Sequence, residues 1–303
     1  MTEFHLRRVD RSQAQAVETL GSKPKFWFRE DDRRLLFKAD DRGTGEDWAE
    51  VIACHLCSLL GLPHVEYELA AEYEGAVYIR PGVVCDNMAP PPFTLVLGNE
   101  LLFALDPQYP KEQRFKVRQH TVVAVSEIVA KLGPLAAKWS PDVPVDVNSA
   151  LDVFSGYVML DAWIANQDRH HENWGALWDG KELRLAPTFD HGASLARNLL
   201  DSEREERLNT KDQMRTVEVF ASRGRSALYH SPDDQRPLKL HEVFLAFCEQ
   251  VPNAADAWLA RLQSINRDKL WSIMNRIPAE RMSKICRQFT IELLVTNQRR
   301  LLE

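Results

Sequence analysis

The segment from Asn166 to Gly175, "NQDRHHENWG", carries a dense group of side chains that could do chemistry. It holds an aspartate, two adjacent histidines, a glutamate and two asparagines within ten residues. Carboxylate and amide oxygens suit a hard cation such as Mg²⁺, whereas clustered histidines suit Zn²⁺ or Mn²⁺. These residue types therefore allow a magnesium site that handles phosphate, the metal centre of a hydrolase, or a polar loop without chemistry.

A second aspartate follows a hairpin signal. Two short apolar runs flank Asp179-Gly180, a pair typical of a two-residue type I′ turn. In such a hairpin Asn173 comes level with about Ala186, so that Asp190 can approach Asn173 and Asp168. An amide oxygen and carboxylates around one gap favour magnesium over zinc.

The spacing of these three residues is that of a kinase catalytic loop. Asp168 and Asn173 are separated by four residues, and Asp190 follows within "FDHG". In this interpretation Asp168 orients or deprotonates the acceptor hydroxyl, while Asn173 and Asp190 bind Mg²⁺. The hypothesis requires a phosphate-binding loop and a lysine elsewhere in the chain.

Both requirements are met near the N-terminus. "LGSKPKFWF" supplies a candidate phosphate loop that includes Gly21, Ser22, Lys23 and Lys25, and "LLFKAD" supplies Lys38 as the lysine for the phosphates. Glu50 lies opposite the large apolar stripe of the helix expected over 46–61, on a face of small residues. A glutamate on such a face is the expected partner of Lys38.

The hydrophobic patterns divide the chain into a strand-rich part and a helical part. Residues 26–39 predict a hairpin, a capping box at Thr44 and Asp47 predicts a helix start, and strands resume before the loop "MAPPPF". Helical patterns follow at 112–132, 149–165, 240–263 and 279–302. We therefore expect a bilobed, protein-kinase-like α+β fold, with a small β-rich N-lobe carrying one helix over 1–97 and a larger helical C-lobe over 98–303.

Composition narrows the class of protein. The net charge of −6 gives no electrostatic reason to expect direct nucleic-acid binding. The sequence has neither a signal-peptide core nor an apolar run long enough for a membrane span, so we expect a cytoplasmic protein. Cys54 and Cys57 form a CxxC pair in the middle of an expected helix, where core packing is the favoured interpretation.

Taken together, "LGSKPKFWF", "LLFKAD", Glu50 before "LLGLP", "DAWIANQDRHHENWG" and "LAPTFDHGASL" resemble the HipA-like serine/threonine protein kinases. The resemblance implies ATP and Mg²⁺ as cofactors, Asp168 as the catalytic aspartate, Lys38 as the ATP lysine, and Asn173 and Asp190 as metal ligands. It also implies that residues 21–25 form the phosphate loop. His170 becomes a structural or nucleotide-side member of the catalytic loop, and Arg80 falls at the inter-lobe hinge beside adenine.

The resemblance further implies partners. A protein serine or threonine is the expected phosphate acceptor, and a small DNA-binding antitoxin is a possible partner. The chain begins almost directly at the phosphate loop, which weakens the expectation of an antitoxin or DNA-bound assembly. Ser22 is a candidate autophosphorylation site, because a phosphate there would compete with ATP for the same backbone donors.

Three other functions remain open from the sequence. "DRHxxN" also resembles the catalytic loop of phosphatidylinositol kinases, so a lipid could be the acceptor. His171, Glu172 and His191 could belong to a Zn²⁺ or Mn²⁺ hydrolase, although that function gives Lys38 and Glu50 no role. The third alternative is a catalytically inactive nucleotide-binding module.

Overall fold

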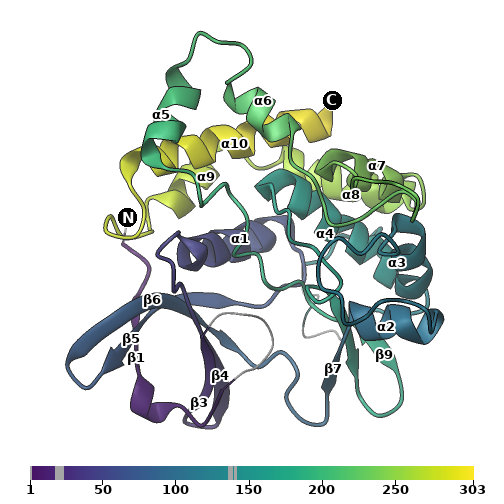
Figure 1. The fold of residues 1–303 in the computed structure, drawn as a ribbon, viewed down its shortest axis with the longest axis horizontal. Coiled ribbons are helices and arrows are strands. Elements are labelled where there is room, and N and C mark those ends of the chain that lie inside the picture. Colours follow the sequence, from purple (N-terminus) through teal and green to yellow (C-terminus); the bar gives the residue numbers. More distant parts are fainter. Residues whose placement is uncertain (1, 18–23, 136–138, 140–141) are drawn as a thin grey trace.

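The computed structural model describes residues 2–17, 24–135, 139 and 142–303. Its N-terminal part is a curled sheet with one helix, and its C-terminal part is mostly helical, which confirms the expected α+β fold (Figure 1). The strands are β1 (Arg7–Asp10), β2 (Ala16–Val17), β3 (Lys25–Glu30), β4 (Arg33–Ala39), β5 (Tyr67–Glu74), β6 (Val77–Asp86), β7 (Thr94–Leu97), β8 (Gly175–Trp178) and β9 (Leu183–Leu185). The helices are α1 (Glu46–Leu60), α2 (Gly98–Leu105), α3 (Val122–Val129), α4 (Ala150–Ile164), α5 (Asp201–Asn209), α6 (Val217–Ser222), α7 (Leu240–Cys248), α8 (Pro252–Gln263), α9 (Arg267–Met274) and α10 (Lys284–Leu302), with a short 3-10 helix at Arg11–Gln13.

The N-terminal sheet has the strand order β1-β5-β6-β4-β3-β2 among the described residues. β1 runs parallel to β5, and the other neighbours are antiparallel. Strands β3 and β4 form the hairpin expected over 26–39. Leu35 and Phe37 of β4 enter a small apolar core, so Leu36 and Lys38 point to the opposite face because side chains alternate along a strand. The alternation thus directs Lys38 away from that core.

Helix α1 is buried on nearly all sides, because it packs against β5 on one side and α8 and α9 on the other. Its start differs from the expected capping box. Gly45 is the N-cap residue, in a left-handed conformation, and Thr44 caps nothing. Instead the Asp40 carboxylate accepts hydrogen bonds from the backbone N–H groups of Thr44, Gly45 and Glu46. The capping carboxylate therefore comes from the end of β4, upstream of the sequence motif.

The second sheet has the order β7-β8-β9 within the described part of the chain. Trp178 pairs with Leu183, so four residues form the hairpin loop instead of the expected two. The side chain of Asp179 accepts from the backbone N–H groups of Lys181 and Glu182, which stabilises this longer loop. Because β7 pairs with β8, the connection between the two sheets lies before Thr94, ahead of the expected lobe boundary at 97.

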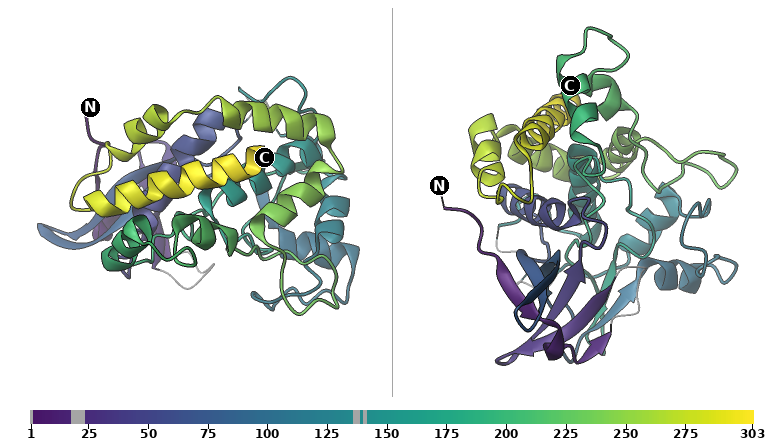
Figure 2. Two further views of the ribbon diagram at one scale, coloured as in Figure 1. Left: turned by 90° about the horizontal axis from the view of Figure 1, so that it is seen from above. Right: turned by 60° about the vertical axis from the view of Figure 1, so that its left-hand side comes forward.

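Two of the expected helices are shorter or divided. The pattern over 112–132 forms a helix only from Val122, because Thr121 caps α3 and Lys116 is left-handed (φ 57°). The pattern over 240–263 forms α7 and α8, which are separated before Pro252, a residue that favours the first turn of a helix. The pattern over 149–165 corresponds to α4, and the one over 279–302 to α10. In both further views α10 lies on the side of the helical part away from the strands (Figure 2).

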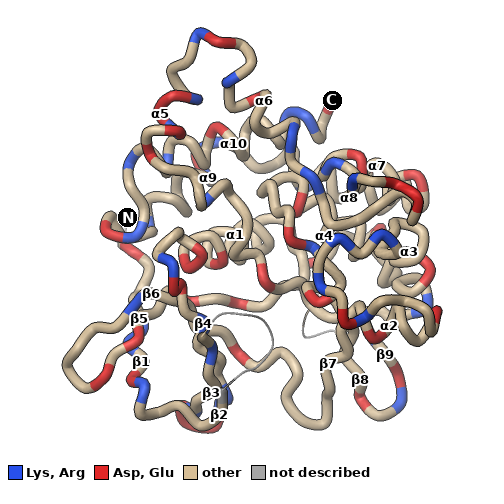
Figure 3. Tube along the Cα trace, in the orientation of Figure 1, with Lys and Arg blue, Asp and Glu red and all other residues tan. Residues whose placement is uncertain are grey.

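Charged residues of both signs are distributed over most elements (Figure 3). Cys54 and Cys57 are buried in α1 within the main core, as the packing interpretation predicted. Among the helices in the described ranges, none combines the length and apolar character that crossing a membrane would require.

Candidate active site

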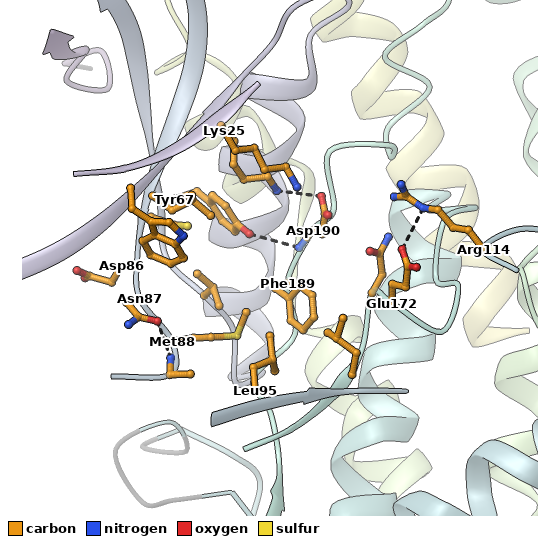
Figure 4. Close-up of a pocket in the computed structure, with 18 residues that line it drawn as sticks. Lys25, Tyr67, Asp86, Asn87, Met88, Leu95, Arg114, Glu172, Phe189 and Asp190 are labelled. Carbon is orange, nitrogen blue, oxygen red and sulfur yellow. Dashed lines mark hydrogen bonds and ion pairs between the residues drawn. The ribbon is translucent and has the colours of Figure 1, made fainter. Parts of the chain in front are cut away.

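A cavity of about 240 Å³ opens between the two sheets (Figure 4). One end is mostly apolar, apart from Asp86 and Asn87, and the other end carries Lys38, Asp190, Arg114 and Glu172. The apolar lining comes from Trp27, Leu36, Val65, Tyr67, Cys85, Met88, Leu95, Leu97 and Phe189, and the polar lining from Lys25, Lys38, Asp86, Asn87, Arg114, Glu172, Asn173 and Asp190. A mostly apolar cavity with lysine and arginine side chains at one end suits a ligand with an aromatic body and an anionic tail.

Lys38 lies at the charged end of this cavity. Its Nζ atom donates to Glu50 Oε1 at 2.5 Å and to Asp190 Oδ1 at 2.9 Å. Burial alone would lower the pKa of Lys38, but the two carboxylates outweigh it and raise the pKa well above the ordinary value. Tyr67 adds to this arrangement, since Nζ lies 5.1 Å from the centre of its ring. Lys38 is therefore a fixed positive charge at the cavity.

Glu50 links α1 to the segment that carries Asp190. Its side chain is nearly fully buried, and while Oε1 accepts from Lys38, Oε2 accepts from the backbone N–H of His191 at 2.8 Å. Asp190 itself is left-handed (φ 60°), and its N–H donates to the Tyr67 hydroxyl at 3.3 Å. One carboxylate thus holds both the lysine and the backbone next to Asp190, which is the pairing that the helical wheel suggested.

Asp168 and Asn173, the catalytic-loop candidates, are held by hydrogen bonds within the loop itself. Asn173 Nδ2 donates to the backbone oxygen of Asp168 at 2.7 Å, and Asn166 Oδ1 accepts from the backbone N–H of Asp168 at 3.2 Å. Asn173 is buried and lines the cavity, whereas the Asp168 side chain is 38% exposed. The loop therefore presents an accessible carboxylate beside an amide that its own backbone fixes.

Beneath the loop lies a charge pair that the sequence reasoning missed. Arg169 donates from Nε and NH2 to both oxygens of Asp161, at 2.7 and 2.8 Å, and from NH1 to the backbone oxygen of Asn173 at 2.8 Å. Asp161 also accepts from Asn166 Nδ2 at 2.8 Å. Both ionised side chains are almost completely buried. The signal in the sequence was a single carboxylate within the apolar helix "VMLDAWIAN".

The histidines pack beside the loop. His171 Nδ1 lies 2.7 Å from the Tyr109 hydroxyl, and His191 Nε2 lies 2.8 Å from Thr188 Oγ1. Burial lowers the pKa of His170 to about 3 and that of His171 to about 4, so both are neutral near pH 7. His170 lies behind the cavity, where Arg114 Nε approaches its Nε2 at 3.2 Å. These contacts fit the structural role predicted for His170.

Arg80 does not line the cavity. Its Nε donates to Glu72 Oε2 at 2.6 Å, and its NH1 group pairs with Asp41. The strand that carries it, β6, reaches the cavity only at its other end, through Cys85 and Asp86. The contact of Arg80 with adenine stays a prediction, and in this structure the residues Asp86–Ala89 line the cavity instead of Arg80. Gly21, Ser22 and Lys23 lie outside the described residues, while Lys25 lines the cavity beside Lys38, its partner across β3 and β4.

Asn173 and Asp190 both line the cavity and bring an amide and a carboxylate to it. Oxygen atoms of these two groups are ligands that Mg²⁺ prefers, and two protein ligands are typical where substrate phosphates complete the coordination. No group of three or more His, Cys, Asp and Glu side chains suited to a metal ion occurs in the ranges that the structure describes. The donor set at the charged end therefore fits magnesium held together with phosphate.

Comparison of the sequence with protein-family models and with curated proteins gives no significant match. Solved structures do match. The proinflammatory kinase CtkA of Helicobacter pylori superposes with a TM-score of 0.69 at 20% identity, over 97% of this chain and 99% of that one. A chain of the Shewanella oneidensis complex of HipA, HipB and operator DNA superposes with a TM-score of 0.57 at 11% identity, over 94% of this chain and 65% of that one.

The chain has the fold of the HipA-like kinases. The CtkA match covers nearly the whole of both chains, so the HipA-like kinase fold accounts for the sheet, α1 and the helical part together. The part of the Shewanella oneidensis chain that has no counterpart here amounts to about a third of its length, since this chain spans 65% of it.

Proposed function

We propose that this protein is an ATP-dependent kinase that transfers the γ-phosphate of ATP to a serine or threonine hydroxyl of a protein, with Mg²⁺. The observation that carries the proposal is the position of Lys38 between Glu50 and Asp190, at the charged end of a cavity that Asn173 also lines. The apolar end would hold the adenine ring between Leu36 and Phe189. The kinase-like fold supports the same assignment.

Each residue has a distinct task in this mechanism. Lys38 donates to phosphate oxygens, and Glu50 keeps its ammonium group in place. Magnesium held by Asn173 and Asp190 would neutralise charge on the phosphates. Asp168 accepts the proton of the acceptor hydroxyl while the new oxygen–phosphorus bond forms, and ADP leaves as the bond to the γ-phosphorus breaks. Positioning and charge neutralisation supply most of the catalysis in such reactions.

The test is an assay with γ-labelled ATP and Mg²⁺ on whole-cell lysate and, separately, on mixed phospholipid vesicles. We expect label on proteins at serine or threonine with the wild type and none with Asp168→Asn, while both proteins bind a fluorescent ATP analogue equally. Label on lipids alone would replace the protein acceptor by a lipid. ATP binding without any labelled product would contradict the kinase assignment.

A further inference from the structure

A second cavity, of about 420 Å³, lies on the other side of the catalytic loop. Three stretches of the chain line it, together with His120: the segment Arg114–Val117, the catalytic loop with Asp168 and His170, and residues from the range 226–237. The cavity therefore contains the proposed catalytic aspartate but neither Lys38 nor Asp190.

Arg114 connects the two cavities, because it lines both. Its Nε atom lies 3.2 Å from Glu172 Oε2 and 3.2 Å from His170 Nε2. Figure 4 shows the ion pair with Glu172 at the edge of the first cavity, across from Asp190. A phosphate held at the charged end of the first cavity and a hydroxyl held beside Asp168 would approach each other past this guanidinium group.

The second cavity has a cationic wall. Arg114 and Lys116 are its positive groups, and Asp168 is its one carboxylate among the described lining residues. Burial lowers the pKa of His120 and His170 to about 3 and that of His171 to about 4, so the histidines that face the cavity are uncharged near pH 7. Phe115, which is 59% exposed, adds an apolar side chain to the lining.

We propose that this cavity is the acceptor site, and that Lys116 and Arg114 select a polypeptide segment in which an acidic residue lies next to the serine or threonine. This inference rests on the proposed kinase function and adds the substrate class. The acceptor hydroxyl reaches Asp168, its oxygen forms the bond to the γ-phosphorus, its proton passes to Asp168, and ADP leaves. The neighbouring carboxylate pairs with the cationic wall, and an apolar side chain packs on Phe115.

Substitution of Lys116 tests the proposed acceptor site most directly. It is exposed, it is separate from the catalytic and metal-binding residues, and Lys116→Glu keeps a side chain with a β-carbon at this left-handed position. Arg118 is the matched control, because it is exposed, carries the same charge and lies two residues along the same segment without lining the cavity. Charge reversal at Arg118 changes the net charge equally, so a general electrostatic effect would appear in both variants.

The experiment uses the full chain and a library of peptides centred on serine or threonine, with each flanking position fixed in turn as Asp, Lys or Ala. Phosphate incorporation and, separately, peptide binding by fluorescence anisotropy with a non-hydrolysable ATP analogue and Mg²⁺ are measured. We expect the wild type to prefer Asp over Lys at one or two flanking positions by about five- to tenfold, as for a partly exposed charge pair. Lys116→Glu should remove or reverse this preference, and Arg118→Glu should keep it.

The outcomes separate the two proposals. Phosphorylation without any Asp preference, or a preference that Lys116→Glu leaves intact, overturns the acceptor site while the kinase stands. Binding of acidic peptides that depends on Lys116 without phosphate transfer supports the site and overturns the kinase. Phosphorylation of phosphoinositide vesicles with no peptide binding overturns the polypeptide acceptor.

Discussion

The catalytic loop has two faces with different chemistry. The face toward the cavities carries Asp168 and Asn173, and the first cavity is also lined by Asp190. The buried face carries Arg169, whose donors are matched to acceptors of Asp161 and Asn173. The charged groups on the first face line cavities where a substrate can bind, whereas those on the second face are buried away from solvent. The difference indicates that accessible ionised groups such as Asp168 can take part in catalysis, whereas the fully buried pair of Arg169 and Asp161 stabilises the loop.

The largest expected effect lies on the cavity face. Asp190→Asn removes the negative charge of the proposed metal ligand, so phosphate transfer should fall about 100- to 1000-fold. Asparagine tolerates the left-handed backbone at this position, and Lys38 keeps Glu50 as a partner, so thermal unfolding should change little. Kinetics with γ-labelled ATP and a thermal melt check both parts. Full activity in this variant would refute the metal assignment.

Arg169→Met should reduce the stability of the protein, in contrast to Asp190→Asn, which should reduce its activity. It leaves the buried Asp161 carboxylate without its ionic partner, which lowers the free energy of unfolding by about 3–5 kcal/mol. Denaturant unfolding measures the loss. The double variant Arg169→Met with Asp161→Leu should recover part of it, because an apolar pair removes the unpaired charge. If the single variant is as stable as the wild type, the buried face does not have the structural role described above.

A third effect appears as a pH dependence. His120 is fully buried, with Nδ1 3.1 Å from the oxygen of Ala227 and Nε2 accepting from Trp174 Nε1 at 3.2 Å. Burial lowers its pKa from 6.5 to about 3. The unfolded chain therefore binds a proton at a higher pH than the folded one, so stability is complete above pH 6.5 and declines as the pH falls toward 3.

By linkage, the protonation of His120 in the unfolded chain lowers the free energy of unfolding at pH 5 by about 2 kcal/mol, relative to pH 8. Denaturant unfolding at pH 8 and pH 5 should show this loss in the wild type, together with losses from the other buried histidines. His120→Gln should reduce the difference between the two pH values. An unchanged difference would mean that His120 is not the neutral, buried group that its contacts require.

The smallest expected effect is that of Arg80→Ala on nucleotide affinity. Arg80→Ala should leave the dissociation constant of a fluorescent ATP analogue within about twofold, since Arg80 pairs with Glu72 and Asp41 outside the cavity. Leu36→Ala, on the cavity-facing side of β4, should weaken binding measurably. A strong loss of affinity in Arg80→Ala would restore the predicted contact with adenine.

Local patterns in the sequence were sufficient for most of the elements. Strand alternation predicted the hairpin that carries Lys38, and the helical wheel predicted that Glu50 would face it, which the 2.5 Å contact confirms. The expected helix over 112–132 was wrong in its first half, because Lys116 is left-handed and Arg114 contacts His170 instead of forming a helical turn. Periodicity reports a local preference that such long-range contacts can outweigh.

The sequence by itself determined the catalytic candidates, because Asp168, Asn173, Asp190, Lys38 and Glu50 lie in motifs whose spacing reflects local backbone geometry. Only the tertiary structure decided which side chains meet outside those motifs. It paired Arg169 with Asp161, placed the Asp40 carboxylate at the start of α1, and put Asp86–Ala89 instead of Arg80 at the cavity. Such pairings depend on how sheet and helices pack, and packing brings together side chains that no local pattern relates.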